Sequence, residues 1–262
     1  MSFTPILPMS GYSGWAFLQR TKEAQEAAHA RSPELKADQE YFAKNISSVE
    51  TPADLIGDYR LLKVALTAFG LADDLPNKAF IQKVLQEGSI DPESFANRMV
   101  DKRYLALTRS FGFDLGTPNT KLSEFADNIL SAYRERSFEI SVGDQNSDFR
   151  LGLSMSRELG RIAATNNTDD GMWYAVMGNE PVRKVFETAL GLPSSVAQLD
   201  IDEQLGIFKK KAQQLLGDHQ ISQFKDPEKI DSLTRTFLVR SELKSLNTAM
   251  SSGSIALMLL QN

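Results

Sequence analysis

Residues 57–71 read GDYRLLKVALTAFGL, and residues 178–192 read GNEPVRKVFETALGL. Aligned without a gap, both stretches carry a Lys-Val pair in the middle and a Gly-Leu pair at the end. Each predicts a helix that ends at a glycine in the left-handed conformation, with the leucine folding back on the last turn. A second match follows in the same order, between Asp91-Pro92-Glu93 and Asp226-Pro227-Glu228. Lys-Val before Gly-Leu is also a common helix ending, but two ordered matches favour a diverged internal duplication.

The rest of the chain has the spacing and the punctuation of helices. Helix starts are predicted where a capping side chain precedes proline, which suits the first helical position. These starts are Ser32-Pro33, Thr51-Pro52, Asp91-Pro92 and Asp226-Pro227. Apolar residues recur at steps of three and four, as at Ile201, Leu205, Phe208, Ala212 and Leu215. The short strand-like alternation over residues 138–142 ends at Gly143, where we predict a helix end. The predicted fold class is all-α and multihelical, with the duplication forming two related helical lobes.

These patterns divide the chain into five predicted segments. Residues 1–41 form an N-terminal helical arm, residues 42–113 the first helical repeat, and residues 114–165 the connecting helices. Residues 166–245 form the second helical repeat, and residues 246–262 an apolar C-terminal tail. The later turns of the arm are polar with only alanines as an apolar face, so the arm has little surface to bury.

Composition narrows the class of protein. The chain of 262 residues has no cysteine, which excludes disulfides and thiolate zinc sites and fits a reducing compartment. Its net charge of -5 and its isoelectric point of about 5.2 disfavour binding to a nucleic-acid backbone. The N-terminus lacks the basic and apolar regions of a secretory signal. The longest apolar run, residues 255–260, is far shorter than the roughly 20 residues of a membrane-spanning helix. We expect a cytoplasmic protein with no membrane span and no nucleic-acid partner.

The sequence contains no recognisable motif for catalysis, metal binding or phosphate binding. Its two histidines, His29 and His219, lie in a polar helix and at a predicted helix end, and we interpret both as solvated or capping side chains. Residues 144–148 read DQNSD, like the opening of a calcium loop, but Phe149 and Met155 stand where that loop requires glycine and glutamate. We interpret this segment as a polar loop that caps the following helix. The sequence predicts no catalytic residue, no cofactor and no metal site.

Two terminal segments are the candidates for contact with another protein. Trp15 begins the N-terminal helix, whose later turns have little to bury. The apolar tail over residues 254–260 either packs into the core or forms an apolar surface that binds a partner or mediates oligomerisation. Trp173 lies among apolar neighbours, and we predict that it packs in the core. The candidate partner-contact residues are Trp15, Phe17, Leu18, Ile255, Leu257, Leu259 and Leu260.

The sequence also resembles a known family. The matching strings are GDYRLLKV at 57–64, AFGL at 68–71, NKAFI at 77–81, DKRY at 101–104, FE at 138–139, VG at 142–143 and LGLP at 190–193. In this order they are similar to a bacterial domain-of-unknown-function family, number 1217, from about Gly14 to about Leu243. The resemblance implies a multihelical fold with an internal duplication. It also implies a flagellum-related role by association, because members of this family tend to lie in flagellar gene clusters of alphaproteobacteria. It brings no functional residues with it.

Two classes of function follow. The first is a non-enzymatic protein-interaction or structural protein that assists flagellar assembly or function, with flagellar components as partners. It would act either as a compact cytoplasmic assembly factor or as an exported axial component whose termini order only on polymerisation. The alternative is a small-ligand-binding protein or enzyme with a pocket between the two lobes. Its candidate ligand contacts, at or beside the repeated stretch, are Arg60, Lys63, Arg183 and Lys184. The sequence leaves the partner's identity and the oligomeric state open.

Overall fold

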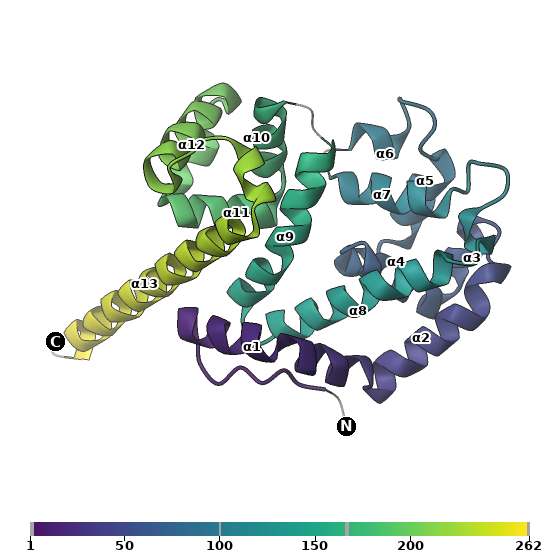
Figure 1. The fold of residues 1–262 in the computed structure, drawn as a ribbon, viewed down its shortest axis with the longest axis horizontal. Helices are drawn as coiled ribbons and strands as arrows, with labels where there is room; N and C mark the ends of the chain where they lie inside the picture. Colours follow the sequence, from purple (N-terminus) through teal and green to yellow (C-terminus); the bar gives the residue numbers. More distant parts are fainter. Residues whose placement is uncertain (1–2, 100, 166–167, 261–262) are drawn as a thin grey trace. The chain divides into compact units, whose positions relative to one another are not determined.

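The computed structural model describes residues 3–99, 101–165 and 168–260, with side chains described to residue 247 except at residue 165. Over these ranges the chain is all-α, as predicted, and contains no strand (Figure 1). The α-helices are α1 (Gly11–Ala30), α2 (Pro33–Asn45), α3 (Pro52–Gly57), α4 (Tyr59–Ala68), α5 (Lys78–Glu87), α6 (Phe95–Arg98), α7 (Lys102–Phe111), α8 (Phe125–Gly143), α9 (Ser147–Thr165), α10 (Asp169–Gly178), α11 (Glu180–Leu190), α12 (Ile201–Leu216) and α13 (Pro227–Leu260). Short 3-10 helices are η1 (Ile46–Ser48), η2 (Ala72–Asp74), η3 (Asn119–Lys121), η4 (Ser194–Gln198) and η5 (Ile221–Lys225). Within the same ranges, no helix combines the length and the apolar character needed to cross a membrane.

Contacts group the chain into two compact units. Unit 1 comprises Met1–Ile6 and Thr21–Ser141, and unit 2 comprises Leu7–Arg20 and Val142–Asn262. Helix α1 therefore begins in unit 2 and ends in unit 1, and α8 begins in unit 1 and ends in unit 2. The five segments predicted from the sequence have other bounds, and that division stays a prediction.

Each unit has its own aromatic and aliphatic core. In unit 1, α2, α4, α5 and α7 bury the side chains of Phe42, Leu62, Ile81 and Phe111, which have no exposed surface. In unit 2, the fully buried Trp173 of α10 packs edge-on against Phe186 and Phe208, with ring centroids 5.5 Å and 5.9 Å away. Trp173 is thus a core residue, as predicted.

The predicted helix starts at Pro33, Pro52 and Pro227 are confirmed, since α2, α3 and α13 begin at these prolines. The predicted start at Asp91-Pro92 is wrong. There the Asp91 carboxylate accepts a hydrogen bond from the Glu93 amide at 2.8 Å and holds a turn. Helix α6 begins only at Phe95, whose amide donates to the Glu87 carboxylate at 2.7 Å. A side chain from the preceding helix therefore sets this start.

The predicted polar loop before α9 is confirmed. The Asn146 side-chain oxygen accepts hydrogen bonds from the Asp148 and Phe149 amides, both at 3.1 Å, and so caps the first turn of α9. The helix end predicted at Gly143 is also confirmed, since α8 ends there. Residues 144–146 thus connect two long helices, and residues 147–148 begin the second of them.

The repeated stretches form α4 and α11, and both end as predicted. Gly70 and Gly191 have φ of 72° and 65°, the left-handed region that glycine enters most readily. The amide of the following leucine then donates 2.8 Å back to the last helical turn, Leu71 to Leu66 and Leu192 to Glu187. This is the Schellman ending that the Gly-Leu pair predicts.

Candidate functional site

A buried carboxylate in unit 1 accepts from groups on two other helices. Asp38 of α2 is 4% exposed. Its Oδ2 accepts hydrogen bonds from Lys63 Nζ and from the Tyr133 hydroxyl, each at 2.9 Å, and Arg60 Nε lies 3.4 Å from its Oδ1. Arg60 and Lys63 are three residues apart on α4, so both reach the same side of that helix. The carboxylate thereby joins α2, α4 and α8.

Two groups of this cluster, Lys63 and Tyr133, have raised pKa values. Burial by itself would lower the pKa of Lys63, but its hydrogen bonds to Asp38 and Glu34 outweigh burial and raise that pKa. Burial and the Asp38 carboxylate together raise the pKa of the Tyr133 hydroxyl. Lys63 is therefore a charged ammonium and Tyr133 a neutral phenol. A phenol of this kind exchanges no proton near neutrality, and the cluster positions the Lys63 cation.

A pocket of 310 Å³ lies beside this cluster, within unit 1. Its apolar lining residues are Phe3, Leu35, Ala72, Leu75 and Ile140. Its polar lining residues are His29, Ser32, Glu34, Lys63, Thr67, Tyr133, Ser137 and Ser141. The volume is at the lower end of the range of small-molecule sites.

His29 is buried in this pocket wall, which corrects the interpretation of it as a solvated side chain. It is 8% exposed, and its ring lies 5.0 Å from the Phe3 ring and 5.9 Å from the Phe138 ring. Both ring nitrogens are buried and have no hydrogen-bond partner among the described residues. Burial lowers the pKa of His29, so the imidazole is neutral at pH 7. It therefore offers one donor and one acceptor, neither of them satisfied.

The N-terminal strap, residues 3–6, is fixed beside the pocket by a glutamine clamp. The Ile6 amide donates to the Gln25 side-chain oxygen at 2.7 Å, and Gln25 Nε2 donates to the Ile6 carbonyl at 3.2 Å. Gln25 is itself buried at 7% exposure. The clamp explains in part why a polar-looking arm helix keeps buried residues, because it holds the strap whose Phe3 ring packs against His29 of α1.

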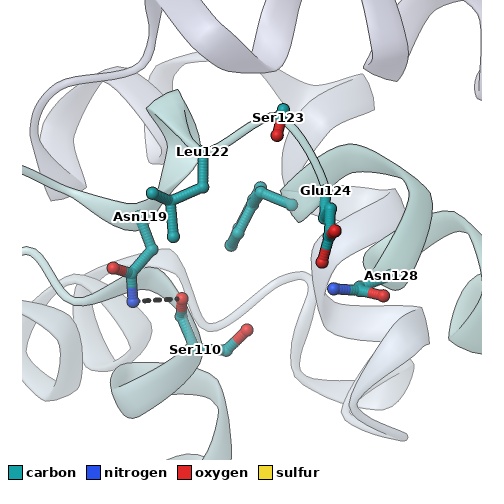
Figure 2. Close-up of a pocket in the computed structure, with 7 residues that line it drawn as sticks. Ser110, Asn119, Leu122, Ser123, Glu124 and Asn128 are labelled. Atoms are coloured by element: carbon teal, nitrogen blue, oxygen red, sulfur yellow. Dashed lines mark hydrogen bonds between the residues drawn. The ribbon is translucent and has the colours of Figure 1, made fainter.

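A second hollow in unit 1, of 390 Å³, is explained by helix capping (Figure 2). Asn119 Nδ2 donates to the Ser110 carbonyl at 3.0 Å, near the end of α7. Glu124 is the one ionisable residue that lines it. An amide that satisfies helix carbonyls needs no ligand, and we assign no chemistry to this hollow.

The predicted ligand contacts of unit 2 are engaged in pairs within that unit. Arg183 Nε donates to Glu187 at 2.7 Å, and another guanidinium nitrogen donates to Gln204 at 2.8 Å. Lys184 Nζ lies 3.9 Å from an Asp148 oxygen. Among the four predicted ligand contacts, Lys63 lines the unit-1 pocket. The predicted pocket between two lobes stays a prediction.

The predicted partner-contact residues of the N-terminal helix are inside unit 2 or half-buried. Trp15 is 5% exposed with its ring 5.9 Å from the Phe149 ring, Leu18 is fully buried, and Phe17 is intermediate. Partner contact through them stays a prediction. The others, Ile255, Leu257, Leu259 and Leu260, lie outside the residues whose side chains the structure describes.

Helix α13 carries an apolar stripe that the sequence analysis missed. The α13 stripe consists of Val239, Leu243 and Leu246, which are 40%, 55% and 54% exposed. Their steps of four and three place them on one helix face. The spacing rule that identifies the other helices also fits these three residues, but the continuous apolar run at residues 255–260 is the stronger signal in this part of the sequence.

The described residues hold no group of three or more His, Cys, Asp or Glu side chains suited to a metal ion. The fold and these features define the class as an all-helical protein of two contact units. A family model described as "Protein of unknown function (DUF1217)" matches residues 68–230, and the chain belongs to that family. Its structure is similar to the X-ray crystal structure of Protein AGR_C_984 from Agrobacterium tumefaciens, a structural genomics target, with a TM-score of 0.73 and 26% sequence identity. That match covers 92% of this chain and 99% of the other. No curated protein sequence matches the chain.

His29 should make stability depend on pH. The unfolded state binds a proton on this imidazole near pH 6.5, whereas the lowered pKa keeps the folded state unprotonated until lower pH. The unfolded state therefore binds more protons below about pH 6.5, and the free energy of unfolding should fall as pH decreases through that window. Urea unfolding at a series of pH values should show this fall in the wild type and its reduction in His29→Leu. His219→Leu removes the other histidine, at an exposed site, and is the matched control. An equal slope in wild type and His29→Leu contradicts the assignment.

Proposed function

We propose that this chain is a non-enzymatic protein-interaction protein that assists flagellar assembly or function, and that α13 contacts its partner. The observation that carries the contact is the α13 stripe, three large apolar side chains at 40–55% exposure on one helix face. The flagellar part rests on the gene-cluster association that the family resemblance implies.

The two halves of α13 differ in their surroundings. Its first part packs on α11 and α9, and Leu233 and Phe237 are fully buried there. Ser241 still donates a hydrogen bond to Asp148 of α9. From Leu243 onward the described side chains are exposed, and Figure 1 shows this end of α13 running out past α9–α12. The second part therefore has little of unit 2 to pack against.

The spacing of the stripe favours another helix as the partner. In the sequence, the alternating steps of four and three continue from Leu246 through Met250, Gly253, Leu257 and Leu260. An apolar repeat that averages 3.5 residues is the pattern of a coiled-coil seam. We therefore assign the occupant as an amphipathic helix of another protein with a matching apolar stripe.

We also propose that the two units arose by internal duplication. Short helices α3 and α10 each begin after a threonine, Thr51 or Thr168, whose hydroxyl accepts from the third helical amide. They end at Gly57 and Gly178, and a single capping residue then starts α4 and α11. The Schellman endings of α4 and α11 extend this parallel. These matched features support a common origin.

The test is a pull-down of tagged protein from motile source cells, with mass spectrometry, beside a deletion scored for swimming. Wild-type bait should enrich flagellar proteins, and Leu246→Asp should lose them, because one charge in an apolar seam costs about 2 kcal/mol or roughly 30-fold in affinity. Deletion should impair swimming, and Leu246→Asp should not restore it.

Ser245→Asp is the matched control, since it adds the same charge at an exposed neighbour of Leu246 that lies about 100° around the helix from it, off the stripe. It should retain the partner and restore swimming. Normal swimming of the deletion strain together with no flagellar protein on the wild-type bait would remove the flagellar proposal. Equal capture by Leu246→Asp and the wild type would remove the α13 contact.

A further inference from the structure

The unit-1 pocket combines an unsatisfied buried histidine with a held cation and an apolar wall. We propose that it binds a small carboxylic acid with an apolar body. The carboxylate pairs with Lys63 and accepts a hydrogen bond from His29. The apolar body lies against Leu35, Leu75 and Ile140.

The unsatisfied groups of His29 point to a ligand. A buried polar atom without a partner costs free energy, and such atoms are rare in folded proteins. His29 leaves two of them in one ring at 8% exposure, in the wall of a 310 Å³ pocket. A ligand oxygen that accepts from the imidazole N–H removes part of this cost on binding.

The charges around the pocket favour an acid over an amine. Asp38 accepts from Lys63 and Tyr133 and pairs with Arg60, so it has little capacity left for a ligand cation. The Lys63 ammonium has three N–H donors, and the Asp38 and Glu34 carboxylates accept from it at 2.9 Å and 3.2 Å.

Glu34 is the group that a ligand carboxylate would replace. Its side chain is 73% exposed, so its bond to Lys63 competes with water and is weak. A carboxylate inside the pocket is shielded from water, and the charge-assisted hydrogen bond that it makes is stronger. Exchange of Glu34 for a ligand is therefore favourable, whereas displacement of the buried Asp38 is not.

Phe3 controls access on one side. Its ring touches the His29 and Phe138 rings, and the glutamine clamp on Ile6 holds the strap that carries it. Replacing Phe3 by alanine opens this side and keeps the Lys63 and His29 side chains themselves, although it removes the ring that packs against the imidazole. If a probe binds Phe3→Ala but not the wild type, the site exists and Phe3 closes it. If a probe binds neither protein, there is no site.

The test uses the full chain and its two histidines as reporters. Benzoate and isovalerate are the acid probes, benzyl alcohol the uncharged probe and benzylamine the cationic probe. NMR of the imidazole C–H resonances should show a saturable shift at His29 with the acids, at millimolar concentration, in the wild type or in Phe3→Ala. The exposed His219 should not shift, and His219→Gln assigns the two signals.

Two substitutions with opposite expected effects identify the charge that binds. Glu34→Gln removes the competing carboxylate and should tighten benzoate binding about threefold, while Lys63→Met should weaken it at least about tenfold, the value of one charge-assisted hydrogen bond. Lys184→Met in unit 2 should leave binding unchanged, and circular dichroism checks that each variant is folded.

Three results overturn the proposal. One is the lack of a saturable His29 shift in both the wild type and Phe3→Ala. Another is binding of benzyl alcohol or benzylamine that is as tight as binding of benzoate. The third is a Glu34→Gln variant that binds benzoate more weakly than the wild type does.

Discussion

Replacing Trp173 by alanine should lower the free energy of unfolding of unit 2 by about 4 kcal/mol, because it removes a fully buried aromatic ring and leaves a cavity. The indole is the contact shared by two other rings, Phe186 and Phe208, which lie edge-on to it. Its Nε1 also donates to the His219 carbonyl at 2.8 Å, so the substitution leaves a backbone acceptor without its partner. The lost ring contacts and the lost hydrogen bond both belong to unit 2, and together they amount to a large part of the usual free energy of unfolding of a domain.

The adjacent residue provides the matched control. Tyr174 is 37% exposed, and its hydroxyl donates to Asp202 at the surface, so Tyr174→Ala should cost less than about 1 kcal/mol. Urea unfolding is followed by tryptophan fluorescence, because the remaining Trp15 also lies in the unit-2 core. A Trp173→Ala midpoint that matches the Tyr174→Ala midpoint would show that the core of unit 2 does not depend on this ring.

The helix ends that the sequence predicts correctly are those set by residues adjacent in the chain. Helix starts at Pro33, Pro52 and Pro227 follow from the proline itself, and those at Pro52 and Pro227 also from the capping side chain before it, whereas Ser32 makes no capping hydrogen bond. The Gly70 and Gly191 endings also follow from adjacent residues. The failure at Asp91-Pro92 has a non-local cause, since Glu87 from the preceding helix caps α6 instead.

The candidate site was less predictable because its partners are far apart in the chain. Lys63 was a predicted contact, but its pairing with Asp38 bridges two helices, and Tyr133 reaches that carboxylate from 95 residues away. The sequence predicts a solvated or capping His29 because its own helix is polar. Phe3 and Phe138, which bury it, come from the N-terminal strap and from α8. Periodicity within one segment carries no information on such contacts.

Replacing Asp38 by alanine should lower the free energy of unfolding by about 3 kcal/mol. In the wild type a lysine and a tyrosine hydroxyl share this one buried carboxylate, and the substitution leaves both without that acceptor. This loss is at the lower end of the usual cost of breaking a buried ion pair, because the Lys63 side chain is 31% exposed and water can solvate it in part. The pKa of Tyr133 should fall as well. Burial would still raise it, but the contribution of the Asp38 charge and its hydrogen bond would be gone.

Glu34 offers the control that isolates burial from charge. It is a carboxylate on the same helix and also accepts from Lys63, at 3.2 Å, but its side chain is 73% exposed. Glu34→Ala should therefore cost less than about 1 kcal/mol, and in an ultraviolet titration it should lower the pKa of Tyr133 less than Asp38→Ala does, because the Glu34 charge is the smallest of the contributions that raise it. Equal destabilisation by the two substitutions would mean that Asp38 acts only as a surface charge. If instead only Asp38→Ala destabilises unit 1 and also weakens benzoate binding, the buried carboxylate both joins α2, α4 and α8 and orients the Lys63 ammonium toward the pocket.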